Sequence, residues 1–210
     1  MLQALYGGAF DPVHLGHLAV ARAARDQLDA DLALVPTGKP SHRDAACASD
    51  RDRIAMLELA LIGEPRLHVD RYELDRNEPS YSVDTLAHWR ATLGVEAPLA
   101  LVIGQDAFAG LPTWHRWHEL FELAHIVVAD RPQAQALPST LTQQIVGREC
   151  KDSHRLHQRP AGCVHYLDLP LHPQSSRSIR ARCAEGLPLT HWVPQAVADY
   201  IARRGLYREA

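Results

Sequence analysis

The feature that most limits the possible folds of this chain is the regular alternation of short apolar runs with segments of helical periodicity. The runs predicted as strands are Met1–Tyr6, Leu32–Val35, Leu67–Leu74, Leu99–Ile103, Ile126–Ala129 and Val164–Leu169. The segments predicted as helices are Gly16–Leu28, Asp50–Ile62, Ser82–Leu93, Trp114–Leu123, Ser176–Glu185 and Pro194–Arg204. Because parallel strands are joined by right-handed helical crossovers, this pattern predicts an α/β fold with a parallel sheet and C-terminal helices.

Length and charge exclude several classes of protein. The 210 residues suit one domain over 1–210, with a polar stretch at about 132–160 predicted as a surface excursion. A net formal charge of −3 excludes a broadly basic surface for nucleic acid. No apolar run approaches the roughly 20 residues that a membrane span needs. We therefore expect neither nucleic acid nor a membrane as a partner.

Cysteine usage and the start of the chain favour the cytoplasm. The four cysteines, Cys47, Cys150, Cys163 and Cys183, are scattered and form no CxxC pair. Such scatter predicts neither a zinc site nor a disulfide framework and suits a reducing compartment. The first residues have neither the basic region nor the cleavage-site pattern of a secretory signal, so a cytoplasmic location is expected.

Two glycines and two histidines flank the turn between the first predicted strand and the first predicted helix. Gly7 and Gly8 let the backbone turn tightly and approach a phosphate with no Cβ in the way. The helix after this turn offers unpaired N–H groups and a partial positive charge at its start. His14 and His17 lie three positions apart there, so both rings can face one anion. The junction is therefore predicted to bind phosphate.

The same junction carries a motif of a known superfamily. The run from Gly7 to His17 reads Gly-Gly-Ala-Phe-Asp-Pro-Val-His-Leu-Gly-His, and it resembles the N-terminal motif of the nucleotidyltransferases with an HxGH element. This resemblance implies a Rossmann-like, doubly wound sheet and nucleotidyl transfer with release of pyrophosphate. It also implies that the triphosphate of ATP contacts Gly7, Gly8, Ala9, Phe10, His14 and His17.

Further stretches resemble one branch of that superfamily, the bacterial nicotinate-nucleotide adenylyltransferases. They are Pro36–Arg43, Ser80–Leu86 and Pro112–Trp117. Ser41 stands where that family usually has a second proline, and Arg43 where it often has lysine. By resemblance, Trp114 stacks on the nicotinate ring, while Trp117 can equally pack in the core. The residues expected to contact the mononucleotide are Lys39, His42, Arg43, Asp84, Thr85 and Trp114.

Two later stretches complete the expected ATP site. Gly104 and Asp106 resemble a GxD element whose carboxylate reaches the ribose of the adenosine. Residues 175–180 resemble an ISSTxIR motif, which implies ATP contacts at Ser176, Ile179 and Arg180. Arg177 stands where the family usually has threonine, so the missing hydroxyl must come from elsewhere or Arg177 adds a phosphate contact. The guanidinium of Arg180 suits a clamp on the triphosphate.

The resemblance implies that ATP and nicotinate mononucleotide react to form nicotinate adenine dinucleotide and pyrophosphate. His14, His17 and Arg180 are the expected catalytic residues. We expect no protein metal site, because Mg²⁺ would be carried mainly by the ATP phosphates. Alternatives left open are preference for the amide mononucleotide, another HxGH adenylyltransferase such as phosphopantetheine adenylyltransferase, and a non-catalytic nucleotide sensor. A homo-oligomer is also left open as a partner state.

Overall fold

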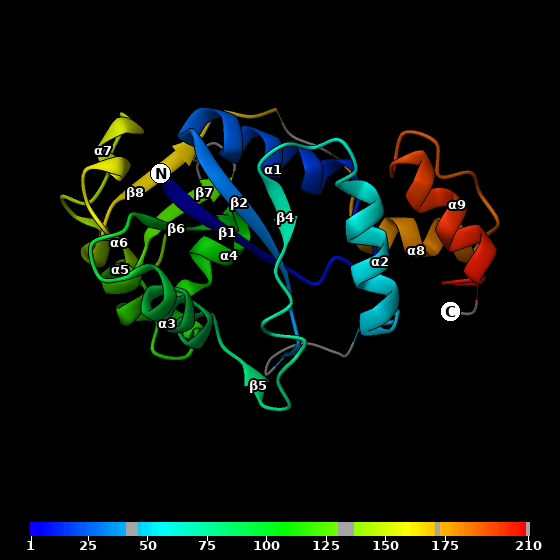
Figure 1. Ribbon diagram of the computed structural model, residues 1–210, viewed down its shortest axis with the longest axis horizontal. Coiled ribbons are helices and arrows are strands. Elements are labelled where there is room, and N and C mark those ends of the chain that lie inside the picture. Colours follow the sequence, from blue (N-terminus) through cyan, green and yellow to red (C-terminus); the bar gives the residue numbers. More distant parts are fainter. Residues whose placement is uncertain (41–45, 130–136, 171–172, 209–210) are drawn as a thin grey trace.

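Parallel strands form the centre of the molecule (Figure 1). In the computed structural model, residues 1–40, 46–129, 137–170 and 173–208 are described. Within these ranges, a six-stranded sheet has the order β4-β2-β1-β6-β7-β8. The strands are β1 (Leu2–Gly8), β2 (Ala30–Pro36), β4 (Leu67–Val69), β6 (Leu99–Gly104), β7 (His125–Ala129) and β8 (Val164–Leu167). Every neighbouring pair in this sheet is parallel, which confirms the predicted α/β class.

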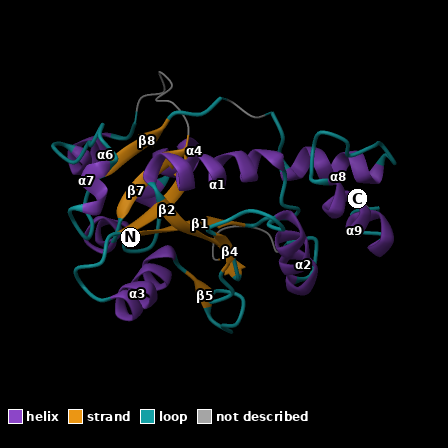
Figure 2. Ribbon diagram, turned by 45° about the horizontal axis from the view of Figure 1, so that its top comes forward, coloured by secondary structure: helices purple, strands orange, loops and turns teal. Residues whose placement is uncertain are grey.

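Helices cover both faces of the sheet, as a doubly wound fold requires. The helices are α1 (Leu15–Leu28), α2 (Asp50–Ala60), α3 (Ser82–Leu93), α4 (Gln105–Ala109), α5 (Leu120–Leu123), α6 (Ser139–Ile145), α7 (His154–His157), α8 (Ser176–Ala184) and α9 (Gln195–Arg204). One hydrophobic core includes residues of α1, α2, α8 and α9, and a second includes residues of α3, α4, α5 and α6. Figure 2 shows α1 and α3 on opposite sides of the sheet. None of the helices in the described ranges is long and apolar enough to cross a bilayer.

Most predicted elements appear within a few residues of their expected ends. In α1 the predicted apolar stripe of Leu18, Ala21, Ala24 and Leu28 is buried. Helix α3 has the predicted bounds. In α9 the chain leaves the helix at Gly205, which has φ 64° as a C-terminal glycine should.

Two predicted elements are shorter than expected. The strand predicted over Leu67–Leu74 ends at Val69, because the Asp70 carboxylate accepts the N–H of Tyr72 at 2.8 Å and starts a turn. The helix predicted over Trp114–Leu123 is broken, because Arg116 has a left-handed backbone with φ 51°. After this break the chain forms a 3-10 turn, Trp117–Glu119, and then α5.

A second, very small sheet was not predicted. It pairs β3 (Lys39–Pro40) with β5 (Pro79–Ser80) in parallel. Each strand has only two residues and contains proline, so neither carries a recognisable strand pattern. This sheet joins the loop after β2 to the approach to α3.

The segment predicted as a surface excursion at 132–160 contributes partly to the core. Residues 130–136 lie outside the described ranges. Beyond them, Leu141 and Ile145 of α6 and Leu156 of α7 are buried. The few apolar residues of this stretch are spaced so widely that the sequence shows no clear periodicity, yet they belong to the two hydrophobic cores.

The C-terminal helices are fixed to the rest of the protein by a buried carboxylate. Asp52 in α2 accepts hydrogen bonds from Tyr200 at 2.9 Å and from Arg204 at 3.1 Å, both in α9. Helices α2, α8 and α9 gather at one end of the molecule (Figures 1 and 2).

Candidate active site

The start of α1 is organised by its two histidines. His14 is the N-cap residue, and its Nδ1 accepts the backbone N–H of His17 at 3.2 Å. The Nδ1 of His17 accepts the backbone N–H of His14 at 3.3 Å in return, which makes a reciprocal capping box. The two rings stack with their centroids 3.6 Å apart. The spacing of three residues thus builds a rigid pair.

These hydrogen bonds fix where each neutral ring carries its proton. A ring nitrogen that accepts a hydrogen bond carries no hydrogen, so the neutral forms of His14 and His17 hold theirs on Nε2. Burial, and then the adjacent His14 ring, hold the pKa of His17 well below its usual value. His17 is therefore neutral at pH 7, with Nε2–H as its hydrogen-bond donor.

The turn between β1 and α1 has a hydrophobic floor. Phe10 is buried, adopts φ 48°, and packs edge-on against His17 with centroids 4.9 Å apart. A Cβ at Gly8 would lie 3.0 Å from the Phe10 ring, whereas a Cβ at Gly7 would meet nothing within 4 Å. Gly8 is therefore required by packing, and Gly7 lies beside open space.

A buried arginine fixes the backbone of the same turn through hydrogen bonds. Arg53 in α2 donates to the carbonyl of Ala9 at 2.8 Å and to the carbonyl of Thr37 at 2.9 Å. The N–H of Thr37 in turn donates to the carbonyl of Gly8 at 2.9 Å. Arg53 therefore fixes the turn after β1 and the loop after β2 relative to each other.

Asp11 connects the junction to distant parts of the chain. Its carboxylate accepts the N–H groups of Cys47 at 2.7 Å and Ala48 at 3.0 Å. The hydroxyl of Tyr207 donates to it at 2.7 Å, and burial, followed by this contact with Asp11, raises the tyrosine pKa. Asp11 is buried and fully engaged, so it serves the architecture of the site.

The structure places the predicted C-terminal motif against the first junction. Arg180 donates to the carbonyl of Asp11 at 2.7 Å, and the hydroxyl of Ser176 donates to the carbonyl of Pro12 at 3.0 Å. Ile179 faces the core, and its N–H donates to the carbonyl of Ser175 at 3.0 Å. An ATP contact at Ile179 stays a prediction. Arg177, which replaces the usual threonine, is exposed.

A cavity of about 210 Å³ opens beside this junction, at the carboxyl ends of β1 and β6. Its remaining walls come from the loop after β2, the start of α3, and the segment that contains Trp114. The lining residues are Gly7, Gly8, Thr37, Glu73, Ser80, Tyr81, Ser82, Leu101, Ile103, Gly104, Ala107, Trp114 and His115. The cavity lies where an open parallel sheet is expected to bind its ligand.

Glu73 joins the walls of this cavity. Its carboxylate accepts the hydroxyl of Thr85 at 2.8 Å and the N–H of Gly38 at 3.4 Å. Burial raises the pKa of Glu73, and hydrogen bonds from Thr85, Gly38 and Ser80 oppose that effect. A Cβ at Gly38 would lie 2.1 Å from the carbonyl oxygen of Glu73, so the two loops meet at a distance that only glycine permits.

The polar residues predicted for the mononucleotide are largely engaged with protein partners. Thr85 is buried and shapes the cavity through Glu73 rather than lining it. Asp84 lies 3.7 Å from the guanidinium of Arg116. Lys39 donates to the carbonyl of Asn77 at 3.0 Å. His42 and Arg43 lie outside the described residues.

The aromatic wall contains one predicted residue and two that were missed. Trp114 lines the cavity, whereas Trp117 is buried in the core. The rings of Tyr81 and His115 lie 4.4 Å apart and line the same cavity. The 3-10 turn Leu111–Thr113 leads directly into Trp114 and His115.

The GxD element closes the end of β6. Gly104 is the N-cap of α4 and lines the cavity, without a side-chain cap for the first N–H groups of that helix. Asp106 is exposed in the first turn of α4. Both residues lie beside the β1 junction, because β6 is the direct neighbour of β1.

The donor set of this site suits anions rather than a protein-bound cation. It consists of Nε2–H groups, helix N–H groups and a guanidinium, all of which donate hydrogen bonds. Across the described ranges, no group of three or more His, Cys, Asp or Glu lies together in a way that could hold a metal ion.

The residues that the sequence did not reveal are mainly those that position others. Arg53 is buried and Glu73 is half-buried, and no local pattern distinguishes these charged residues from exposed residues of the same type. Tyr81 carried a weak signal, because it lies inside the Ser80–Leu86 stretch. Gly38 also carried one, in the turn after β2.

Comparison with known proteins assigns the family. Residues 5–182 match the family model described as Cytidylyltransferase-like. The probable nicotinate-nucleotide adenylyltransferase of Stenotrophomonas maltophilia is 45% identical, over 99% of this chain and 97% of that protein. The probable nicotinate-nucleotide adenylyltransferase of Laribacter hongkongensis is 47% identical, over 97% of this chain and 93% of that protein.

A solved structure agrees on the fold. Plasmodium falciparum nicotinic acid mononucleotide adenylyltransferase complexed with NaAD superposes with a TM-score of 0.72 at 13% identity, over 98% of this chain and 97% of that chain. From the family match and the full-length similarity to these relatives, this chain belongs to the nicotinate-nucleotide adenylyltransferase family of the cytidylyltransferase-like proteins.

Proposed function

We propose that this enzyme transfers the adenylyl group of ATP to nicotinate mononucleotide, forming nicotinate adenine dinucleotide and pyrophosphate. The observation that carries the proposal is the position of the His14–His17 pair and Arg180 beside a cavity walled by Trp114. An anion-binding helix start thus adjoins an aromatic pocket at one end of the sheet. Family membership supports the same reaction.

The chemistry needs positioning more than acid–base catalysis. The attacking group is the phosphate of the mononucleotide, whose second pKa is near ~6, so most of it is dianionic at pH 7. One of its oxygens attacks the α-phosphorus of ATP, the bond from that phosphorus to the bridging oxygen breaks, and pyrophosphate leaves. The main barrier is the repulsion between two anions, so charge neutralisation and alignment should supply most of the rate.

We assign the phosphate contacts to the β1–α1 junction. The N–H groups at Gly7 and Gly8, with the rings of His14 and His17, receive the triphosphate. His17 donates through Nε2–H without a net charge, since its pKa is held low. Arg180 adds a full positive charge for the leaving pyrophosphate, and the carbonyl of Asp11 holds its guanidinium in place. Gly104 and Asp106 are assigned to the adenosine.

The metal ion is assigned to the substrate rather than to the protein. Adenylyl transfer from ATP uses a divalent ion to offset phosphate charge, and we propose Mg²⁺. The donors at the junction do not fit a cation, and Asp11 beside them is saturated with hydrogen bonds. We therefore assign Mg²⁺ no protein ligands.

The mononucleotide is assigned to the aromatic cavity. Trp114 would stack on the pyridinium ring, an arrangement favoured in the same way as a cation over an aromatic face. The nicotinate carboxylate would then lie at the start of α3, where Tyr81 is the N-cap and no side chain caps the helix. Glu73 and Thr85 would act as positioning residues for this wall.

One assay tests the proposal. The full chain is incubated with ATP and Mg²⁺ and with either the acid or the amide mononucleotide, and both pyrophosphate and the dinucleotide are measured. We expect both products with the acid form, and much slower formation with the amide. Faster reaction with the amide would show that the preferred substrate is nicotinamide mononucleotide. Absence of products with both would reject the proposed reaction.

A further inference from the structure

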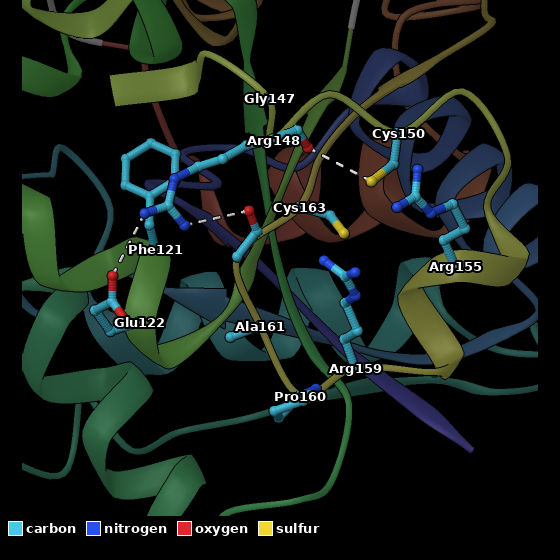
Figure 3. A pocket seen from close by; sticks show the side chains of 11 residues that line it. Phe121, Glu122, Gly147, Arg148, Cys150, Arg155, Arg159, Pro160, Ala161 and Cys163 are labelled. Atoms are coloured by element: carbon cyan, nitrogen blue, oxygen red, sulfur yellow. Dashed lines mark hydrogen bonds and ion pairs between the residues drawn. The ribbon is translucent and has the colours of Figure 1, made fainter. Parts of the chain in front are cut away.

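A second cavity, of about 300 Å³, lies at the opposite end of the sheet, where β7 and β8 begin. Arg148, Arg155 and Arg159 line it, and the thiols of Cys150 and Cys163 form its floor. In Figure 3 the guanidinium groups of Arg155 and Arg159 both point toward the two sulfur atoms. We call these five residues the arginine pocket.

The arginine pocket carries positive charge that the protein does not neutralise. Arg148 is engaged, since it donates to the carbonyl of Gln144 at 3.1 Å and lies 3.5 Å from the Glu122 carboxylate. Arg155 and Arg159 differ, because within the described ranges neither guanidinium has a hydrogen bond or an ion pair. Glu122 is the acidic residue among those that line the cavity, and its carboxylate is paired with Arg148, so the two like charges of Arg155 and Arg159 face the cavity without an ion-pair partner in the described ranges.

The thiols do not supply that counter-charge. Burial, and then a hydrogen bond with Cys150, raise the pKa of Cys163 to about 11. Cys163 is therefore a neutral thiol at pH 7. Cys150 donates its S–H to the carbonyl of Arg148 at 3.5 Å.

The backbone around the pocket is fixed by a buried histidine. The Nδ1 of His125 accepts the N–H of Cys163 at 3.0 Å, and its Nε2 lies 3.0 Å from the carbonyls of both Leu156 and Arg159. The ring is therefore in its Nε2–H form, and burial lowers its pKa so that it stays neutral. His125 thus holds both the segment that carries Arg159 and the strand start that carries Cys163.

The absence of a side chain at Gly162 leaves room for the guanidinium of Arg148 beside the pocket. Gly162 has φ 91°, and a Cβ there would lie 3.2 Å from a terminal nitrogen of Arg148. On the other side, Leu156 anchors α7 in the core and leaves Arg155 and Arg159 exposed. The pocket therefore has a rigid frame before any ligand arrives.

We propose that the arginine pocket is a binding site for a doubly charged tetrahedral oxyanion, such as a phosphate or diphosphate group. Two guanidinium forks that converge on one cavity match the oxygens of a phosphate, and a dianion offsets their mutual repulsion. The site is separate from the proposed adenylyl-transfer site, because it lies at the amino ends of the strands. Its occupation does not depend on the proposed reaction.

The test is a titration of the ¹⁵N-labelled full chain with inorganic phosphate and, separately, with pyrophosphate. The amide signals of Gly147, Gly162 and Cys163 and the Nε–H signals of Arg155 and Arg159 report the arginine pocket. The amide signals of Gly7 and Gly8 report the active site in the same spectra. We expect saturable shifts in the signals that report the arginine pocket. The anion that binds more tightly shows whether the pocket prefers a single phosphate group or a diphosphate.

A matched pair of double variants separates a site from general charge. Arg155→Gln/Arg159→Gln should weaken binding at the arginine pocket by about tenfold or more, with the Gly7 and Gly8 response unchanged. The control, Arg51→Gln/Arg203→Gln, removes the same charge from exposed positions in α2 and α9 and should leave both responses unchanged. Shifts confined to Gly7 and Gly8, or equal weakening by both double variants, would overturn the proposal. A dispersed amide spectrum without anion shows that each variant folds.

Discussion

The side of the candidate active site that we propose to bind phosphate, called here the phosphate side, and its aromatic side differ in how far apart in the chain their parts lie. On the phosphate side, the Gly7–Gly8 turn and the His14–His17 capping box lie within one strand–helix junction. The aromatic side is assembled from distant segments. The half-buried Glu73 carboxylate accepts hydrogen bonds from Gly38 and Thr85, and Trp114 lines the same cavity as Glu73.

Because of this difference, we expect substitutions on the two sides to have different effects. The histidine pair is held by backbone N–H groups three residues away, so a substitution there changes the ligand contact and leaves the scaffold intact. The aromatic side depends on long-range contacts between loops. A substitution there alters the pocket shape, and binding of the mononucleotide should suffer before the chemical step does.

The largest expected effect is on the phosphate side. His17→Ala removes the Nε2–H donor from the triphosphate, and kcat should fall about 100-fold or more while the fold persists. Steady-state kinetics and a thermal melt measure the two quantities. The control is His154→Ala, which removes an exposed histidine of α7. A folded His17→Ala enzyme with near-normal kcat would show that this side does not act through His17.

The next largest effect is on the aromatic side. Trp114→Ala removes the stacking surface, and KM for nicotinate mononucleotide should rise about tenfold, with a much smaller change in KM for ATP. Trp114→Phe keeps an aromatic face and should recover part of the loss. Equal increases in both KM values would mean that Trp114 only packs the cavity wall.

A smaller effect tests the long-range connection itself. Glu73→Ala removes the acceptor of the Gly38 N–H and the nearer of the two acceptors of the Thr85 hydroxyl, which should cost about 1–3 kcal/mol of unfolding free energy. KM for the mononucleotide should rise several-fold, and Glu73→Gln, which keeps an acceptor oxygen, should restore much of it. Chemical unfolding and the two KM values distinguish the outcomes. If KM for ATP rose as much, the two sides would not be independent.

The smallest effect concerns pH and the phosphate side. Since the pKa of His17 lies well below its usual value, the free enzyme already carries the neutral ring above pH ~6.5. Raising the pH from 7 to 8.5 removes no proton from it, so kcat/KM for ATP should change less than about twofold. A requirement for protonated His17 would instead lower kcat/KM about tenfold per pH unit. A pH–rate profile over this range measures which form acts.

The same contrast explains which parts of the molecule could be predicted from sequence. Buried parallel strands such as β6 are continuous apolar runs, and α1 has a clear apolar stripe, so both were found within a residue or two of their ends. The helix predicted at Trp114–Leu123 failed because Arg116 takes a left-handed backbone. Arginine has no particular preference for that conformation, so the sequence gives no sign of it. The break comes just after Trp114 and His115, which are two of the residues that line the cavity.

The sequence by itself determined the α/β class, the strand–helix junction with its histidine capping box, and the family, because each depends on short-range patterns. A capping box spans only four residues, and a buried strand needs only a short apolar run. Tertiary structure alone decided that Ile179 faces the core, that Thr85 serves Glu73, and that Arg155 and Arg159 converge on a second cavity. The physical reason is that burial and charge pairing depend on which distant segments meet, and that information is not local to any one of them.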